Sequence, residues 1–349
     1  TPVSQTSPRT TTPPTGPDVV GSPSTRTPGE RPGVPARVDV AHTVTVPAAP
    51  DVVFALLADV ERWPLIFPPT VHARFLERAP DEGGPERLQL WATANGGVRT
   101  WTSRRLVDPV RRRISFGQDR PQSPVAAMGG EWIVSPADAG SEVVLTHTYA
   151  AVGDDAETLG WLEKAVDGNS RAELAALAEA AREKEAGLET AFTFRDSLHI
   201  ESTAAEVYGF LDRAERWEQR LPHVARVRLT EDLPGVQILE MDTRTADGSS
   251  HTTRSVRICR ASRSIHYKQL VTPALLRVHT GSWLLTEDDR GVTVVAEHTV
   301  VLETAAVAQV LGPDADVRQA RAFVRDALGR NSSATLRQAK AFAEGTSGA

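Results

Sequence analysis

Two histidines lie in the middle of stretches that alternate apolar and polar residues, the pattern of a half-buried strand. His147 lies in residues 143–149, and His298 lies in residues 295–299. Imidazole gains and loses a proton near neutral pH, so an inward-facing histidine could transfer protons to and from a bound molecule. A histidine in a strand is more often structural, but the same residue type at matching places in two similar stretches leaves both interpretations open.

An arginine beside a tryptophan could supply a positive charge to the same chemistry. Arg104 ends the segment Trp101-Thr102-Ser103-Arg104. A guanidinium stays charged when partly buried, so it could stabilise a developing oxyanion. Strand alternation places Trp101 and Arg105 on one face and Arg104 on the other. Arg104 therefore points inward together with Trp101 only if the strand contains a bulge.

Two asparagines lie on the apolar stripes of long helical patterns. Asn169 follows Leu162 and Val166 at helical spacing, and Asn331 lies on an equivalent stripe. A buried amide must form hydrogen bonds or face a wet cavity. A structural hydrogen bond and a cavity lining are both open for these residues.

These residues belong to two copies of one pattern. Glu-Arg-Trp occurs at 61–63 and again at 215–217, and Gly-Glu-Trp-Ile at 130–133 is matched by Gly-Ser-Trp-Leu at 281–284. For Trp63 and Trp217, core packing is the simpler interpretation and ligand contact is the alternative. The repeat is far longer than a solenoid unit, so it predicts two domains, at 37–187 and 188–345.

Each copy has the same predicted order of elements. A strand leads into a helix and a short second helical segment, several strands follow, and a long helix closes the copy at 157–184 or 316–342. This order predicts an α+β domain whose antiparallel sheet wraps around the last helix. Residues 1–36 contain no Leu, Ile or aromatic residue, so they are expected to form a disordered tail.

Composition excludes several classes of function. The 39 Lys+Arg against 45 Asp+Glu give a net charge of −6 without a basic block, which argues against nucleic-acid binding. No apolar run is long enough to span a membrane. Cys259 is the single cysteine, which excludes an internal disulfide and a cysteine-based zinc site and fits the reducing cytoplasm. Metal-binding and nucleotide-binding motifs are absent from the sequence, so neither a metal nor a nucleotide cofactor is expected.

Together these segments resemble the two-domain aromatase/cyclases of bacterial type II polyketide synthases. The resemblance covers residues 38–344 and rests mainly on Glu-Arg-Trp-Pro at 61–64, the segment 101–104, Gly-Glu-Trp at 130–132 and Asn-Ser at 169–170. It implies a Bet v 1 or START-type helix-grip fold of the SRPBCC superfamily, in which a curved antiparallel sheet and a long helix enclose a cavity. The residues implied for the first cavity are Trp63, Trp101, Arg104, Met128, Trp132, His147 and Asn169. Those implied for the second cavity are Trp217, Arg254, His279, Trp283, His298 and Asn331, with Val256 as the alternative counterpart of Arg104.

The resemblance also implies a reaction and partners. The reaction is an aldol cyclisation of a poly-β-ketone on an acyl carrier protein, followed by dehydration to an aromatic first ring, and it needs no cofactor. Other type II polyketide synthase components are implied as further partners. We expect the first copy to cyclise the chain with Arg104 and His147, and the second to dehydrate it with His298 and Arg254. The alternatives are a non-catalytic START-like carrier of an apolar or aromatic molecule, and a pair in which one copy only supports the other.

Overall fold

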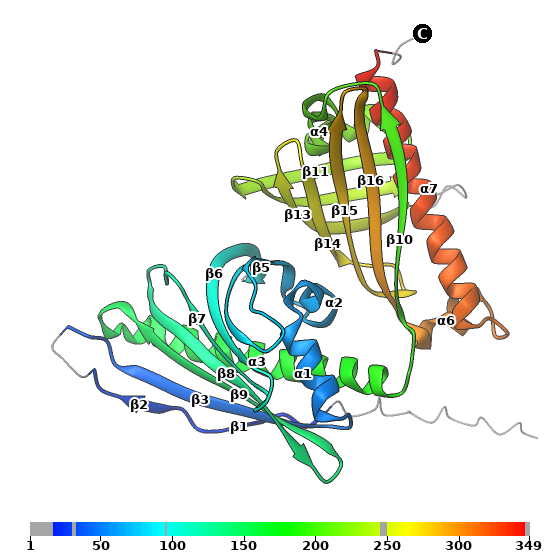
Figure 1. The fold of residues 1–349 in the computed structure, drawn as a ribbon. Coiled ribbons are helices and arrows are strands. Elements are labelled where there is room, and N and C mark those ends of the chain that lie inside the picture. Colours follow the sequence, from blue (N-terminus) through cyan, green and yellow to red (C-terminus); the bar gives the residue numbers. More distant parts are fainter. Residues whose placement is uncertain (1–16, 30–32, 95, 245–249, 346–349) are drawn as a thin grey trace, which may run out of the picture.

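The computed structural model describes residues 17–29, 33–94, 96–244 and 250–345. These form two units of one architecture, each an antiparallel sheet with a long C-terminal helix on one face (Figure 1). The strand order is β1-β3-β9-β8-β7-β6-β5-β4 in the first sheet, with β2 also paired to β3, and β10-β16-β15-β14-β13-β12-β11 in the second. The helix-grip architecture expected from the sequence is therefore confirmed.

The strands of the first unit are β1 (Val20–Gly21), β2 (Thr25–Thr27), β3 (Arg37–Val46), β4 (Thr70–Glu77), β5 (Gly84–Ala94), β6 (Gly97–Asp108), β7 (Arg113–Gln118), β8 (Val125–Ala137) and β9 (Gly140–Ala151). Its helices are α1 (Pro50–Ala58), α2 (Trp63–Ile66) and α3 (Ala156–Glu185), with 3₁₀ turns at Val60–Arg62 and Val152–Asp154. Helix α1 begins with Pro50, whose missing N–H costs nothing in the first turn.

The strands of the second unit are β10 (Ala191–Ile200), β11 (Val224–Leu233), β12 (Val236–Arg244), β13 (Ser250–Arg260), β14 (Ser264–Val271), β15 (Leu276–Asp288) and β16 (Gly291–Leu302). Its helices are α4 (Ala204–Asp212), α5 (Trp217–Arg220), α6 (Val307–Leu311) and α7 (Val317–Ala343), with 3₁₀ turns at Ala214–Arg216 and Thr304–Ala306. The Thr203 hydroxyl caps α4 by accepting from the Glu206 N–H, and a capping box at Asp316 and Gln319 starts α7.

The two units repeat each other down to strand register. Gly130 pairs with His147 between β8 and β9, and Gly281 pairs with His298 between β15 and β16. Trp63 and Trp217 each begin the short second helix of their unit. These matches confirm the prediction that both halves adopt one fold.

Part of the segment expected as a disordered tail is ordered. Strands β1 and β2 pair with β3 and extend the edge of the first sheet. The Ala36 N–H donates to Asp154 Oδ1 at 2.7 Å, and Arg26 forms an ion pair with Asp154 at 3.5 Å. The expectation failed here because short polar strands gain backbone hydrogen bonds at a sheet edge without burying apolar area.

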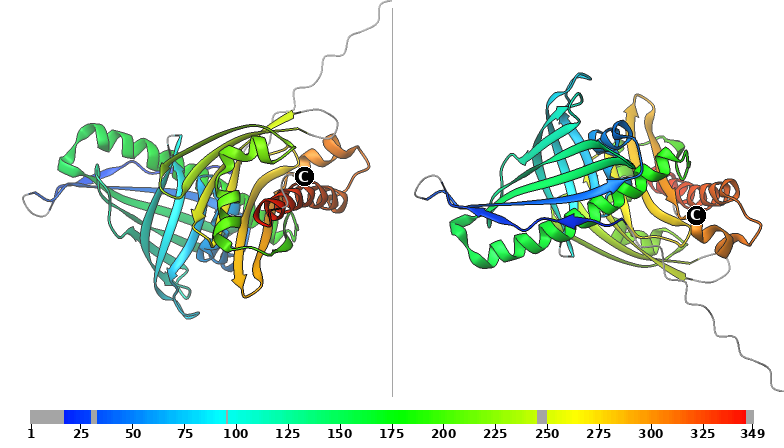
Figure 2. Two further views of the ribbon diagram at one scale, coloured as in Figure 1. Left: turned by 90° about the horizontal axis from the view of Figure 1, so that it is seen from above. Right: turned by 90° about the horizontal axis from the view of Figure 1, so that it is seen from below.

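The two units contact each other through the outer face of the second sheet. Figures 1 and 2 show this sheet against the α2 and β4 side of the first unit. Val71 and Trp91 form an apolar cluster with Val236, Val256 and Ile258 of the second unit. Arg277 adds an ion pair at 2.7 Å to Glu183 on α3. Across the ranges described above, no helix combines the length and apolarity needed to cross a membrane.

Candidate functional site

The second unit encloses a cavity of about 150 Å³ between the inner face of its sheet and helix α7. Its lining includes five residues predicted for this cavity, namely Trp217, His279, Trp283, His298 and Asn331. Asn331 is exposed, so it lies at the rim, whereas its neighbour Ser332 is buried on the inward side of α7. The structure therefore brings together most of the residues that the sequence suggested for the second half.

Two imidazoles meet in this cavity. His279 Nε2 lies 3.0 Å from His298 Nδ1, and the Tyr267 hydroxyl lies 3.2 Å from the same atom. Both histidines are about 5% exposed, and burial lowers the pKa of His279 to about 3 and of His298 to about 4. Both are therefore neutral at pH 7, and each can donate or accept a hydrogen bond.

His298 has an unused hydrogen-bonding atom. With its Nδ1 engaged, its Nε2 is buried and has no hydrogen-bond partner among the described residues. The ring stacks on Phe194, with 4.9 Å between the centroids, which holds its plane. A buried polar atom without a partner is costly, so this position favours a bound molecule that supplies one.

The cationic residue of this cavity is Arg257, and Arg254 is not part of the lining. Strand β13 pairs with β12 without interruption, so Thr253, Ser255 and Arg257 share the cavity face. Arg254 lies on the opposite face together with Val256, which belongs to the cluster between the units. Arg254 and Val256, the two candidate counterparts of Arg104, therefore both point away from the cavity. Side chains alternate along a strand, so Arg257 is the arginine of β13 that faces the cavity.

The surroundings of Arg257 lack a carboxylate directly across the sheet. Its Nη1 and Nη2 donate to the carbonyl oxygens of Asp212 and Leu211, and its guanidinium lies 5.3 Å from the centroid of Trp217. The residue paired with it on β12 is Gln237. Burial lowers the pKa of Arg257, although guanidinium stays protonated at neutral pH. The carboxylates of Asp212 and Glu215 act on Arg257 through space, but its described hydrogen bonds go only to backbone carbonyl oxygens, so it can still donate to a bound anion.

The first unit has the same arginine in a different setting. Arg105 donates to the carbonyl oxygens of Leu57 and Ala58 and also to Glu86 Oε2, at 2.6–3.0 Å. Glu86 is the residue paired with Arg105 across β5, where the second unit has Gln237. The Arg105 charge is therefore already neutralised by a buried carboxylate.

Arg104 does not point into the first unit. Strand β6 pairs with β5 without a bulge, and the Arg104 side chain is 75% exposed and forms an ion pair with Asp119 Oδ1 at 2.5 Å. The expectation of an inward Arg104 is therefore wrong, because successive side chains of a strand point to opposite faces and Arg105 takes the inward one. Trp101 lies on the inward face and packs against a cluster that contains Leu88 and Leu90.

His147 faces helix α3, but its helical partner is not Asn169. His147 Nδ1 lies 3.3 Å from Ser170 Oγ, and its ring contacts Phe116 edge to face. Burial, with a smaller contribution from His42, lowers the pKa of His147 to about 4. Asn169 is exposed, so the prediction that it bounds a cavity is wrong. One residue is a rotation of about 100° on a helix, which places Ser170 inward instead.

The aromatic residues predicted for the first unit form a wall. Trp63 Nε1 donates to the Leu57 carbonyl at 3.2 Å, and its ring meets Phe67 edge to face. Phe67 in turn stacks on Trp132, with 6.1 Å between their centroids. Met128 packs near Tyr149 and also borders a separate hollow of about 290 Å³.

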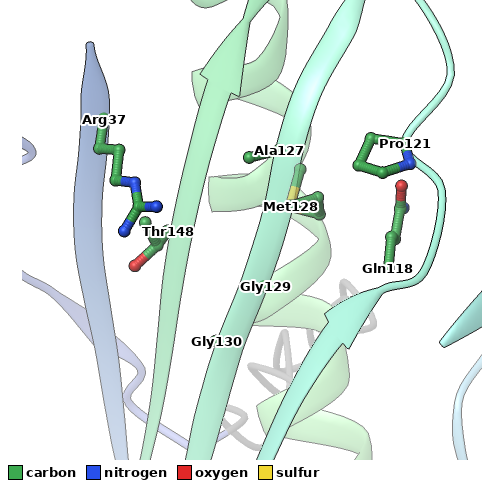
Figure 3. A pocket seen from close by; sticks show the side chains of 8 residues that line it. All are labelled: Arg37, Gln118, Pro121, Ala127, Met128, Gly129, Gly130 and Thr148. Atoms are coloured by element: carbon green, nitrogen blue, oxygen red, sulfur yellow. The ribbon is translucent and has the colours of Figure 1, made fainter. Parts of the chain in front are cut away.

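That hollow is not the predicted first cavity. Figure 3 shows Arg37, Gln118 and Thr148 around it. Apart from Met128, none of the residues predicted for the first cavity lines it. In the described structure, the cavity that brings together the residues predicted from the sequence is thus in the second unit.

Sequence reasoning missed several inward polar residues, among them Arg257, Tyr267 and Glu173. Glu173 lies one turn after Ser170 on α3 and is half-buried, and burial raises the pKa of its carboxyl to about 7. Alternation from Trp101 could have identified Arg105 as inward, and through the repeat its counterpart Arg257. Helical spacing from Leu162 could have identified the face of Ser170 and Glu173.

Tandem helix-grip units, one of which encloses a cavity lined by arginine, histidine and tryptophan, define the START-like aromatase/cyclase class. Comparisons with known proteins agree with this class. Residues 37–182 match the family described as polyketide cyclase / dehydrase and lipid transport. The chain is 47% identical over 305 residues to the granaticin polyketide synthase bifunctional cyclase/dehydratase of Streptomyces violaceoruber, covering 87% of this chain and 93% of that protein. It is 46% identical to the actinorhodin counterpart of Streptomyces coelicolor, covering 88% and 98%.

Two solved structures are similar over both units. They are the di-domain aromatase/cyclases BexL of the BE-7585A pathway, with 50% identity and a TM-score of 0.80, and StfQ of the steffimycin pathway, with 36% identity and a TM-score of 0.75. Each comparison covers 88% of this chain, with 98% of BexL and 99% of StfQ. The chain belongs to the bifunctional cyclase/dehydratases of polyketide synthases, and it is an enzyme of cyclisation and dehydration rather than a carrier.

Proposed function

We propose that this enzyme closes and aromatises the first ring of a poly-β-ketone carried by an acyl carrier protein. The other components of a type II polyketide synthase are its further partners, and its location in the cytoplasm is part of the same proposal. The observation that carries the proposal is the second-unit cavity, whose lining combines the Arg257 cation with two neutral imidazoles and two indoles. A carrier of apolar molecules would not need a buried cation and an unpaired imidazole nitrogen in its cavity.

The chemistry follows from the acidity of the substrate. A methylene between two carbonyls loses a proton to a base, and the resulting carbon attacks a carbonyl carbon farther along the chain. The carbonyl oxygen becomes an alkoxide, takes up a proton, and later leaves as water when a neighbouring C–H loses its proton. Each step needs a proton acceptor, a proton donor and a partner for the oxyanion, and none needs a redox group.

The described residues can fill these roles in the second unit. His298 is neutral, so it can accept the proton of a C–H next to the ring alcohol, and His279 and Tyr267 are within hydrogen-bond reach of its Nδ1. Arg257 can stabilise the oxygen that carries developing negative charge. The set suits proton transfer, so we assign dehydration to this unit.

Cavity size supports the same assignment. A cavity of about 150 Å³ in another protein is known to bind benzene. The second-unit cavity, at about 150 Å³, therefore fits one six-membered ring, and the rest of the chain must extend beyond it. A single ring is what remains to be dehydrated after the first cyclisation.

We assign first-ring closure to the first unit. In this proposal the aromatic wall of Trp63, Phe67 and Trp132, which is packed into the core of the first unit, shapes the inner face against which the chain folds. His147 and Glu173 are its candidates for proton transfer, because Ser170 contacts His147 and Glu173 lies one turn farther on the same helix. Arg104 has no part in this proposal, because its side chain lies outside.

Product analysis with a reconstituted minimal polyketide synthase tests the proposal. Wild-type protein should convert the chain into a product with an aromatic first ring, and His298→Ala should accumulate a cyclised, non-aromatised intermediate. Unchanged product ratios on adding wild-type protein would refute the enzymatic role of this chain in such a system. Full aromatisation by His298→Ala would refute the assignment of the second unit.

A further inference from the structure

A lysine of the second unit ends inside the first. Lys268 on β14 is about 5% exposed, and its Nζ donates to the carbonyl oxygens of Phe67, Pro68 and Thr70 at 3.0, 3.0 and 2.8 Å. These three carbonyls lie within residues 67–70, which connect α2 to the first residue of β4 in the first unit. An ammonium has three N–H donors, so all of them are used within one turn.

This turn carries the centre of the aromatic wall. Phe67 is 1% exposed and lies between Trp63 and Trp132, which it contacts edge to face and by stacking. The Phe67 N–H donates to the Trp63 carbonyl at 2.8 Å. Fixing the Phe67 carbonyl from outside therefore fixes the residue that holds both indoles in place.

The hydrogen-bond path continues to the buried arginine. Trp63 Nε1 and Arg105 Nη1 both donate to the Leu57 carbonyl, at 3.2 and 3.0 Å. Lys268 is thus linked to Arg105 through Phe67, Trp63 and Leu57. Hydrogen bonds in such a connected network strengthen one another, so the loss of a donor at one end weakens the groups along it.

Among its described residues, the first unit has no equivalent lysine that reaches into the second unit. Ile114 pairs with Trp132 in the first sheet, and Ile265 pairs with the equivalent Trp283 in the second, so the two isoleucines correspond. Lys268 lies three residues after Ile265, and the residue three after Ile114 is Gly117. Gly117 has no side chain to reach the second unit. The second unit therefore holds the wall of the first, and the first has no matching lysine for the second.

Neighbouring contacts keep Lys268 in register. His266, two residues earlier on the same face of β14, stacks on His72 of β4 with 4.4 Å between ring centroids. Burial lowers the pKa of His72 to about 3 and also lowers that of His266, so the stacked pair is uncharged at neutral pH. Burial lowers the pKa of Lys268 to about 7, and the three carbonyl acceptors favour its protonated form, which has three donors.

We propose that Lys268 is a positioning residue for first-ring closure, because it holds the 67–70 turn and thereby the Trp63, Phe67 and Trp132 wall of the first unit. This inference rests on the proposed function, in which that buried wall shapes the face of the first unit against which the chain folds. It gives the second unit a task in the first reaction step, beyond its own cavity.

The test compares Lys268→Met, which keeps the length of the side chain and removes its donors, with Lys340→Met in the full chain. Lys340 is the control, since its Nζ also donates to a backbone carbonyl, that of His199, but within the second unit, where it also pairs with Glu344 at 2.7 Å. Lys268→Met should lower kcat for first-ring closure by about tenfold to a hundredfold, the effect expected of a misplacement of about 1 Å. Its KM should change less, and Lys340→Met should match wild type.

A spectroscopic comparison separates positioning from loss of the fold. Lys268→Met should change the near-ultraviolet circular dichroism of the tryptophans, and most of that change should disappear when Trp63→Phe is the background. Lys268→Gln retains an N–H donor, so its kcat should lie between those of wild type and Lys268→Met. It also serves as the test variant if Lys268→Met does not fold.

Unchanged kcat together with an unchanged dichroism spectrum would overturn the positioning role. Equal losses in Lys268→Met and Lys340→Met would also overturn it, because they would indicate general destabilisation. If wild type itself produces no cyclised product, the proposed function fails, and the dichroism comparison still decides whether Lys268 positions Trp63.

Discussion

Replacing Arg257 by methionine removes the cation of the second cavity while keeping most of its apolar side-chain volume. The matched control is Arg254→Met, three residues earlier on β13 and on the opposite face of the sheet. Both variants lose one positive charge, so their comparison isolates the charge that borders the cavity. The structure predicts that only Arg257→Met impairs aromatisation.

The magnitude follows from the surroundings of Arg257. No carboxylate lies directly across the sheet, because Gln237 takes the place that Glu86 has in the first unit. Asp212 and Glu215 act on Arg257 through space, but no described carboxylate accepts a hydrogen bond from it, so it can donate to an oxyanion. The loss of one such donor typically costs about 3–4 kcal/mol of transition-state stabilisation. This corresponds to a fall on the order of a hundredfold to a thousandfold in the dehydration rate.

Arg257→Met should lower the free energy of unfolding by less than it lowers the stabilisation of the transition state. Arg257→Met leaves the carbonyl oxygens of Leu211 and Asp212 without this donor, for which we expect a destabilisation of about 1–3 kcal/mol. Removal of a buried charge partly offsets that loss. Unfolding in urea should therefore show a lower midpoint but a cooperative transition.

The assay is a time course of products in the reconstituted synthase, followed by mass spectrometry. The ratio of cyclised, non-aromatised product to aromatic product should rise steeply for Arg257→Met and stay at the wild-type value for Arg254→Met. A dehydration rate within about threefold of wild type for Arg257→Met would refute the reasoning. So would an equal loss in Arg254→Met.

Three further outcomes are expected. Since folding lowers the pKa of His279 to about 3 and of His298 to about 4, the unfolded chain binds more protons between about pH 3 and 6.5. The free energy of unfolding should therefore fall as the pH drops through that window, and His298→Gln should flatten this dependence in urea titrations. Arg104→Ala should leave both reaction steps near wild type in product assays, because its only described ion pair is with Asp119 on the outside. Glu173→Gln should slow first-ring closure and remove an ionisation near pH 7 from its rate profile, whereas a profile that keeps this ionisation would exclude Glu173 as its source.

The fold followed from the sequence because its determinants are local and occur twice. Alternation along 38–46 and 143–149 indicated strands, and the repeat of Glu-Arg-Trp indicated two equivalent units. The tail strands β1 and β2 were not predictable by the same reasoning. They are held by pairing with β3, which leaves no apolar pattern in the residues themselves.

The residue types of the candidate site were predicted, but two of the chosen residues were each one position away from the inward one. Arg104 was chosen from a motif although alternation favoured Arg105, and Asn169 was chosen although Ser170 is the inward residue of that helix. One position along a strand or helix changes the face on which a side chain lies. Contacts such as those of Lys268 lie between the units, and no periodicity within either copy reports on them.

The one-directional lysine contact has a consequence for the history and the engineering of this chain. Two copies that arose by duplication could at first diverge independently. Once a lysine of one copy donates hydrogen bonds to a turn of the other, a substitution in that turn is tolerated only if the lysine can still bind it. An exchange of first units between relatives would then succeed only when the incoming 67–70 turn suits the resident Lys268 and His266. Chimeras built for new aromatic products should therefore be cut so that this turn and strand β14 come from the same parent.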